Sequence, residues 1–262
     1  MHDRVALRRA IGLLFVHAFW LYWPLYRAYK RRIDRLERAW VRDWLRDGDA
    51  VVDVGANIGV YAEYFAELVG ATGEVHAFEP DPLNYSRLHH LASSHPTIHP
   101  TQAAVGDRNG RIELFQSAGL NFDHHTYRNA DDDTSVEVPL VRLDDVEPLR
   151  TRSIRLVKID VQGADLSVLR GMTAILARNP EACVLVEYYP FGLASSGASP
   201  QDLISFLREG DFTVSSFDPD PQLLFTGVDR VGDRDWYRNL VLSRGSVQPQ
   251  GLTHVLLDEV GA

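Results

Sequence analysis

Acidic side chains stand at the ends of three apolar segments of this sequence. The first acid is Asp53 in VVDVGANIGVY (51–61), where a run of small residues comes directly after it. Glu79 ends the segment VHAFE, and Asp160 follows the strand-like segment LVKI. Carboxylates accept hydrogen bonds from hydroxyl groups, and bare backbone N–H groups at a helix N-terminus attract ligands. Together these residues predict a binding site for a small, hydroxylated molecule, although the glycines could also serve only a tight turn.

The first segment differs from the common phosphate-binding loops. Its glycines lack the spacing of the dinucleotide motif, and no lysine followed by Ser or Thr forms a P-loop. Asp53 would repel a phosphate but suits a cation or hydroxyl groups. Glu79, at the end of the next predicted strand, is placed to accept hydrogen bonds from both hydroxyls of a ribose. A nucleoside-containing ligand is therefore expected.

Alternating strand and helix patterns must position these residues. Short apolar runs at 50–55, 73–80, 154–161 and 182–189 alternate with helical patterns at 58–69, 82–93 and 164–178. A further helix is predicted after Ser199, and extended segments are predicted at 97–106, 111–117, 212–218 and 238–244. This order predicts an α/β fold with a doubly wound, mainly parallel sheet, whose ligand site lies at the carboxyl ends of the strands.

Composition excludes some classes of function. The 262 residues carry a formal net charge of −9, so a nucleic-acid partner is not expected. Cys183 is the single cysteine, which rules out an internal disulfide and fits a cytoplasmic protein.

The N-terminal segment, residues 1–46, is predicted to be a helical extension of a domain at 47–262. Residues 11–26 are apolar and aromatic, with basic residues on both sides, but the run is shorter than the roughly 20 residues that span a bilayer. Such a helix could lie on a membrane surface, pack on the domain, or contact a second copy. Residues 33–45 are amphipathic, and the residues expected on their apolar face are Ile33, Leu36, Trp40, Val41 and Trp44.

The segment QSAGLNFDHHTYRNADDDTSVEVP (116–139) has a different character from the rest of the domain. It is polar, contains two histidines and several acids, and shows little periodicity. Long irregular segments in compact domains often form lids or binding loops, so a lid-like insertion is predicted here.

The chain resembles the FkbM family of S-adenosylmethionine-dependent methyltransferases. The resemblance rests on VVDVGANIGVY, VHAFEPDPLNYSRL, AAVGDRNG, VRLDDV and LVKIDVQGADLSVLRGM, and covers residues 47–187. The chain departs from the family's usual D-V-E-G-A-E pattern at two positions. Gln162 replaces the first glutamate of that pattern, and Asp165 replaces the second. The resemblance implies a Rossmann-like class I methyltransferase with a seven-stranded sheet.

The resemblance also implies roles for individual residues. The methionine portion of S-adenosylmethionine would lie on Gly55, Ala56 and Asn57, its ribose on Glu79, and its adenine near Ala103, Ala104 and Asp107. The cofactor-binding set predicted in full is Asp53, Gly55, Ala56, Asn57, Gly59, Glu79, Ala103, Ala104, Asp107 and Asp160.

A base for the acceptor hydroxyl is expected among the polar residues near this site. NFDHHTY is similar to an Asn-Gly-Asp-His segment of part of the family, which indicates His124 or His125, with Asp123 beside them. Asp160 is the rival base. A divalent cation held by Asp160 with Asp123 or Glu187 is a less favoured alternative.

The function predicted from these features is S-adenosylmethionine-dependent O-methylation of a small or glycosylated metabolite, since FkbM relatives act on sugars, polyketides and other secondary metabolites. The alternatives are a nicotinamide-dependent oxidoreductase, which the glycine spacing disfavours, and a non-catalytic cofactor-binding protein. The expected partner is a hydroxylated small molecule. The aromatic N-terminal helix could add a membrane-surface contact or a homodimer contact.

Overall fold

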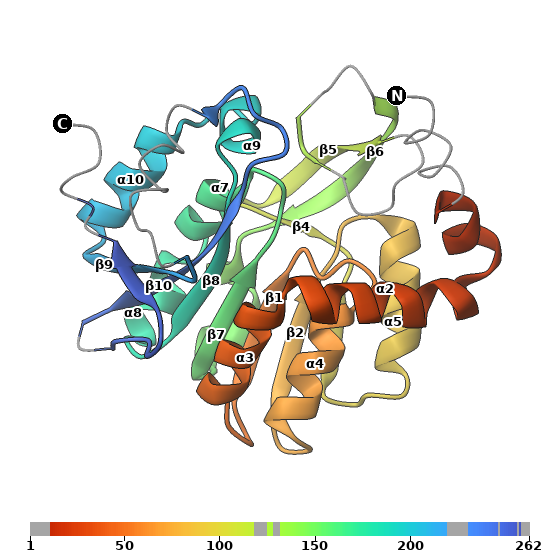
Figure 1. The fold of residues 1–262 in the computed structure, drawn as a ribbon, viewed down its shortest axis with the longest axis horizontal. Helices are drawn as coiled ribbons and strands as arrows, with labels where there is room; N and C mark the ends of the chain where they lie inside the picture. The colour runs from red at the N-terminus through yellow and green to blue at the C-terminus, as the bar shows by residue number, and fades with distance from the viewer. Residues whose placement is uncertain are drawn as a thin grey trace.

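A twisted sheet forms the centre of the molecule (Figure 1). The computed structural model describes residues 11–117, 125–127, 132–218, 230–245, 247–255 and 257. Eight strands pair in the order β11-β9-β10-β8-β7-β1-β2-β3. Their bounds are β1 Ala50–Val54, β2 Glu74–Phe78, β3 Ile98–Thr101, β7 Ile154–Ile159, β8 Cys183–Tyr188, β9 Phe212–Ser216, β10 Arg238–Arg244 and β11 Thr253–Val255.

The pairing confirms the predicted doubly wound, mainly parallel sheet. β3, β2, β1, β7 and β8 run parallel, whereas β10 pairs antiparallel with both β8 and β9. The expected count of seven strands is corrected to eight, because β11 adds an antiparallel pair at the outer edge of β9. Three residues are too few to give a readable alternation pattern, which is why the sequence did not indicate this strand.

Helices cover both faces of the sheet. Along β1, Val52 and Val54 face a cluster formed with α7–α10, and Val51 faces a second cluster formed with α3, α4 and α5. The helices are α2 Phe19–Ile33, α3 Arg35–Trp44, α4 Val60–Val69, α5 Pro82–Ala92, α6 Glu147–Thr151, α7 Asp165–Arg170, α8 Thr173–Arg178, α9 Pro190–Ser195 and α10 Pro200–Glu209, with a 3-10 turn η1 at Leu143–Asp145.

Two predicted helices gain detail from the structure. α10 begins with the predicted Ser199 N-cap, whose hydroxyl accepts a hydrogen bond from the backbone N–H of Asp202. The helix predicted at 164–178 is two helices, α7 and α8, separated at Gly171. A Cβ on Gly171 would lie 1.9 Å from the carbonyl oxygen of Gly106, so the chain passes too close there for any side chain.

A second, smaller sheet has the strand order β4-β6-β5. It consists of β4 Ala104–Val105, β5 Gly110–Ser117 and β6 Asp132–Val141. β5 and β6 pair antiparallel, so residues 132–139 of the predicted insertion form a regular strand rather than an irregular loop. Val136 and Val138 lie in the apolar cluster of this sheet, an alternation that the preceding acidic run obscured in the sequence. The lid role stays a prediction.

The N-terminal helices pack against the domain, in agreement with one of the sequence interpretations. Phe15 and Tyr22 are buried against Ile58 and Val60, at the start of α4. The guanidinium group of Arg27 forms ion pairs with two glutamates of α4, at 2.8 Å and 3.0 Å. None of the helices described is both long enough and apolar enough to cross a bilayer.

The apolar face predicted for residues 33–45 is only partly correct. Trp40 and Val41 are buried, whereas Ile33 and Leu36 are 48% and 51% exposed. The helix is interrupted at Asp34, whose backbone (φ −88°, ψ 32°) separates α2 from α3. This change of direction turns Ile33 and Leu36 away from the core, which helical spacing alone cannot reveal.

We expect Gly55→Ala to destabilise the fold strongly. Gly55 has φ +78°, and a Cβ there would lie 2.0 Å from the carbonyl oxygen of Asp160, so strain and overlap add to about 2–5 kcal/mol. Gly197→Ala is the matched control, because Gly197 has φ +87° and open space around it, and should lose about 1–2 kcal/mol. Urea unfolding measures both, and equal losses would contradict the close approach.

Candidate active site

The predicted acidic residues meet at the carboxyl ends of the parallel strands. The backbone N–H of Asp160, after β7, donates a hydrogen bond to the carbonyl oxygen of Val54 at the end of β1 (3.0 Å). Lys158 lies between Asp53 and Asp160, with its Nζ 3.7 Å from an oxygen of the first and 3.3 Å from one of the second. Glu79 follows β2, the neighbour of β1.

The turn between β1 and α4 is held by β2 and by its own side chains. The N–H groups of Gly55 and Ala56 both donate to the carbonyl oxygen of Phe78, at 3.0 Å and 2.9 Å. Asn57 has a left-handed backbone (φ +51°), and its side-chain oxygen accepts a hydrogen bond from Ile58 N–H. These hydrogen bonds hold the shape of the turn.

Glu79 belongs to the same turn. Its two carboxyl oxygens accept hydrogen bonds from the backbone N–H groups of Asn57 (2.8 Å) and Asp81 (2.9 Å). Burial raises the pKa of this carboxyl to about 8, although these hydrogen bonds oppose the shift. The Asn84 side chain also forms a hydrogen bond with this carboxyl. A carboxylate has about four acceptor positions, so about one remains for a ligand.

The residues predicted near an adenine lie beyond β3. Ala103 and Ala104 are buried, and Ala104 pairs with Leu140 in the small sheet. The N–H of Ala103 and that of Glu79 share one acceptor, the carbonyl oxygen of Thr101. Asp107 is exposed and forms an ion pair with Arg108. Ala103 is thus close in the structure to Glu79, while the Asp107 carboxylate turns to solvent.

The charges around Lys158 set the protonation of its neighbours. Burial raises the pKa of Asp53 to about 6, and the Lys158 ammonium opposes this rise. Burial also acts on Asp160, but the charges of Lys158 and Lys30 hold its pKa below the usual value. Neither carboxylate oxygen of Asp53 has a hydrogen-bond partner among the described residues, although both are buried.

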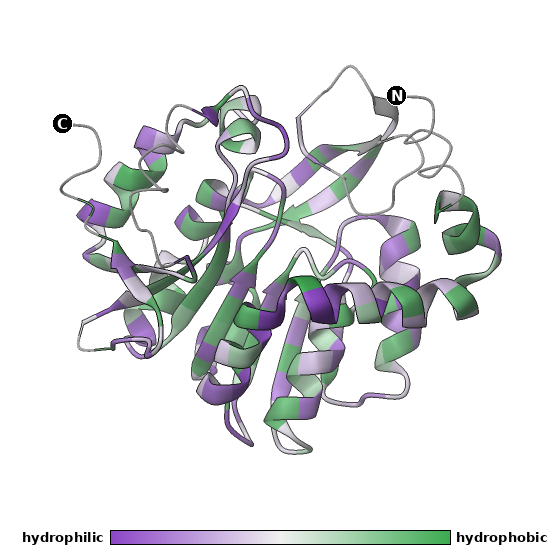
Figure 2. Cartoon of the chain, in the orientation of Figure 1, coloured by the Kyte–Doolittle hydropathy of each residue, from purple (hydrophilic) through white to green (hydrophobic). Residues whose placement is uncertain are grey.

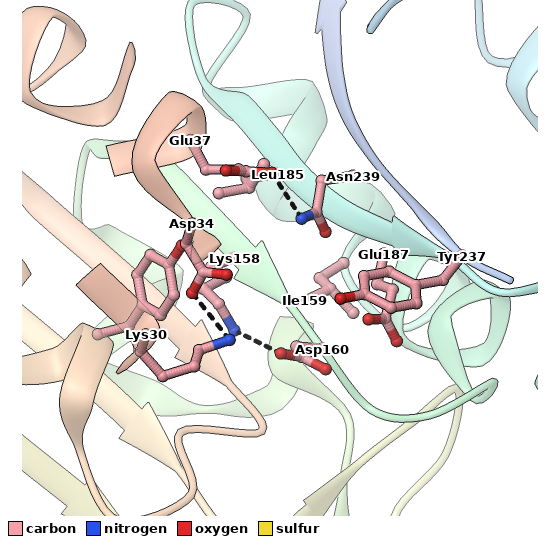
Figure 3. A pocket seen from close by; sticks show the side chains of 11 residues that line it. Lys30, Asp34, Glu37, Lys158, Ile159, Asp160, Leu185, Glu187, Tyr237 and Asn239 are labelled. Carbon is pink, nitrogen blue, oxygen red and sulfur yellow. Dashed lines mark hydrogen bonds and ion pairs between the residues drawn. The ribbon is translucent and has the colours of Figure 1, made fainter. Parts of the chain in front are cut away.

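A pocket beside this network receives residues from the N-terminal helices (Figure 3). Lys30 of α2 forms an ion pair with Asp34 (2.8 Å), and Glu37 of α3 accepts a hydrogen bond from the Asn239 side chain (2.9 Å). The lining residues are Lys30, Asp34, Glu37, Tyr61, Lys158, Ile159, Asp160, Leu185, Glu187, Tyr237 and Asn239.

No sequence motif placed Lys30, Asp34 or Glu37 at the site. One available signal was the i,i+4 pair of Lys30 and Asp34, placed where the apolar run ends. That pair is also common on solvated helices, so the pattern alone could not identify a pocket.

Gln162, in the turn after β7, connects two of the acidic residues that line the pocket. The amide nitrogen of Gln162 donates to Asp160 (3.3 Å) and to Glu187 (3.2 Å). Burial and the negative charges of Asp160 and Asp165 raise the pKa of Glu187 well above its usual value. Within the described ranges, no cluster of three or more His, Cys, Asp or Glu side chains forms a metal site, and Asp123 lies outside those ranges.

The two candidate histidines differ in what the structure describes. His124 lies outside the described residues, whereas the His125 side chain is buried and stacks on Tyr127 with ring centroids 4.4 Å apart. The backbone of His125 pairs with that of Phe115 in β5. His125 is not among the described residues that line the pocket, and its catalytic role stays a prediction.

We expect Lys158→Met to destabilise the protein more at pH 8 than at pH 5. Removing the ammonium leaves Asp53 buried without a counter-charge, which costs about 3–5 kcal/mol when Asp53 is ionised. A carboxyl whose folded-state pKa is raised loses stability as pH rises from its usual pKa through the raised one. In the variant that pKa rises beyond about 6, so the loss extends to higher pH.

Urea unfolding at several pH values measures this difference. The double variant Lys158→Met/Asp53→Asn serves as the control, since it removes the buried charge and should recover much of the stability at pH 8. Equal destabilisation by Lys158→Met at pH 5 and pH 8 would contradict the assigned role of the ion pair.

Comparison with known proteins agrees with this geometry. The "Methyltransferase FkbM domain" family matches residues 53–214. The 31-O-demethyl-FK506 methyltransferase FkbM of Streptomyces tacrolimicus is 34% identical over 159 residues, or 49% of this chain and 61% of that protein. The hexuronic acid methyltransferase AglP of Haloferax volcanii is 29% identical over 171 residues, or 64% of this chain and 65% of that protein.

A solved structure shares the fold. The methyltransferase FkbM of Methylobacillus flagellatus aligns with a TM-score of 0.50 and 16% identity, over 76% of this chain and 44% of that one. The chain spans less than two thirds of the length of the two curated relatives described above. Since the family match extends over more than half of the sequence, the chain belongs to the FkbM methyltransferase domain family.

Proposed function

We propose that this protein is an S-adenosylmethionine-dependent O-methyltransferase that acts on a hydroxyl of a small or glycosylated metabolite. The observation that carries the proposal is the direct contact between the buried Glu79 carboxyl and the backbone N–H of Asn57 in the glycine turn. This contact joins a buried acid to the glycine turn, and Asp160, which lies against Gly55, lines the polar pocket. The names of the two relatives, both methyltransferases, support the same activity.

The residues present fit S-adenosylmethionine. Glu79 retains an acceptor position for a ribose hydroxyl, and the buried Asp53 oxygens lack hydrogen-bond donors among the described residues. Gly55, Ala56 and Asn57 would hold the methionine portion, and Ala103 lies close enough to Glu79 to border the adenine. When bound, the cofactor would supply an electrophilic methyl group.

The pocket suits an acceptor with several hydroxyl groups. Glu37, Glu187 and Asn239 offer acceptor atoms to hydroxyls, and Tyr61 offers a ring face. The ammonium group of Lys30 lies at the same pocket and could pair with a carboxylate of the acceptor. A sugar or a sugar acid fits this lining, and the hexuronic acid named for AglP supports that choice of first test compound.

Glu187 is the base that we favour for the acceptor hydroxyl. Its raised pKa makes the ionised form a stronger proton acceptor than Asp160, whose pKa is lowered. Lys158 and Gln162 would hold Asp160 and Glu187 in position, while the fixed pocket would orient the hydroxyl. His124 and His125 remain the alternative bases.

S-adenosylhomocysteine should bind the protein and raise its melting temperature, whereas NAD should not. We expect Glu79→Gln to weaken this binding about 10- to 100-fold, because charge-assisted hydrogen bonds to the ribose are lost. The wild-type affinity should rise with pH up to about 8, since the ionised Glu79 is the stronger hydrogen-bond acceptor for the ribose, and should not change with pH in Glu79→Gln.

Calorimetric titration between about pH 6.5 and about pH 9, on both sides of that pKa, measures the affinity. The exposed Glu181→Gln is the matched control and should bind like the wild type. A melting shift with NAD alone would contradict the proposal and favour an oxidoreductase, and binding without any methyl transfer would favour a non-catalytic protein.

Transfer of a labelled methyl group to a hexuronic acid glycoside tests the proposed base. Glu187→Gln should lower kcat about 10²- to 10⁴-fold and leave the affinity for S-adenosylhomocysteine unchanged. The wild-type kcat should rise with pH, because a base with a raised pKa becomes active only when it ionises. If Glu187→Gln retains full kcat, the base is another residue, and His124→Ala and His125→Ala are the next variants.

A further inference from the structure

Exposed apolar side chains are concentrated on the N-terminal helices. Of the eleven large apolar side chains exposed among the described residues, eight lie between residues 13 and 36, and Trp20 is 78% exposed. We call this set the outer face; its members are Leu13, Val16, Trp20, Leu21, Leu25, Tyr29, Ile33 and Leu36. Contiguous exposed apolar surface usually marks a contact with another molecule.

The outer face is distinct from the side of the helix that packs on the domain. Phe15 and Tyr22 point inward and are buried, and Lys30 points into the acceptor pocket. In Figure 1, α2 lies across the upper end of α4, and Figure 2 shows apolar residues recurring along α2. The apolar character of the outer face is therefore not needed for the fold of the described chain.

The charge of the outer face is of one sign. Residues 11–33 contain no Asp or Glu, in a chain whose formal net charge is −9. Arg31, Arg32 and Arg35 are exposed at the C-terminal part of the outer face and form no ion pair with any described residue. The nearby acid, Asp34, is buried in its pair with Lys30.

We infer that the outer face docks on the surface of an anionic membrane, with α2 lying in the plane of the lipid headgroups. Tryptophan and tyrosine side chains prefer the level of the lipid headgroups, so Trp20 and Tyr29 would lie there. The leucines would insert just below that level. The three exposed arginines would contact lipid phosphates. This inference does not depend on methyl transfer.

Charge complementarity favours a membrane over a second copy of the chain as the occupant. In a symmetric dimer through this face, the outer face of the second copy would offer these arginines no exposed acidic side chain to pair with. An anionic bilayer supplies negative charge along the whole length of the helix, together with an apolar layer for the leucines.

Co-sedimentation of the full chain with lipid vesicles tests the inference. We expect binding to vesicles that contain phosphatidylglycerol, weaker binding to phosphatidylcholine alone, and loss of binding at high salt. Trp20→Ser/Leu25→Ser should reduce binding at least about tenfold, because it removes inserted apolar surface, and Arg31→Gln/Arg32→Gln should reduce the preference for phosphatidylglycerol.

Val231→Ser is the matched control, since Val231 is an exposed apolar residue outside the outer face. This variant should bind vesicles like the wild type. All these side chains are exposed, and an unchanged melting temperature would confirm folding of the variants. Absence of vesicle binding by the folded wild type would overturn the inference. So would a dimer in light scattering that Trp20→Ser/Leu25→Ser dissociates while vesicles remain unbound.

Discussion

The candidate site depends on the ion pairs that the Lys158 ammonium forms with Asp53 and Asp160. Asp53 and Asp160 stand on neighbouring strands whose carboxyl ends meet, and two carboxylates so close would repel each other without a cation. Lys158 lies in β7 and Asp160 directly follows that strand, so the sheet itself supplies the counter-charge. The lowered pKa of Asp160 follows from this arrangement, and the negative charge of Asp160 adds to the rise that burial causes in the pKa of Glu187.

Helix α2 joins this site to the surface of the molecule. Its inner side buries Tyr22 against the start of α4 and places Lys30 at the pocket, while its outer side exposes Trp20 and Tyr29. A helix is about 10–12 Å across, so both sides act within a short distance of each other. Some aromatic residues of the N-terminal segment therefore pack on the domain, and others are exposed to solvent. This explains why composition agreed both with packing on the domain and with contact to another molecule.

The sequence could predict the fold and the strand-end acids because both depend on local patterns. Parallel strands end at one edge of a sheet, so Asp53, Glu79 and Asp160 had to lie near one another. Lys30 and Glu37 could not be placed in the same way, because their position depends on the break at Asp34 and on long-range packing against α4. Strand β6 was missed because the acidic residues before it hide its alternation.

The contacts of Gln162 explain what an amide, in place of the glutamate of the family pattern, does at this position. Its amide nitrogen lies between Asp160 and Glu187 and donates to both, whereas a glutamate there would add a third carboxylate to a buried cluster. The amide donates a hydrogen bond to ionised Glu187 and so reduces the repulsion between the two carboxylates. It carries no positive charge, and a positive charge at this position would lower the pKa of Glu187 further. Glu187 consequently keeps a raised pKa beside an ionised Asp160, a difference between two neighbouring carboxyl groups that suits one for proton transfer and the other for positioning.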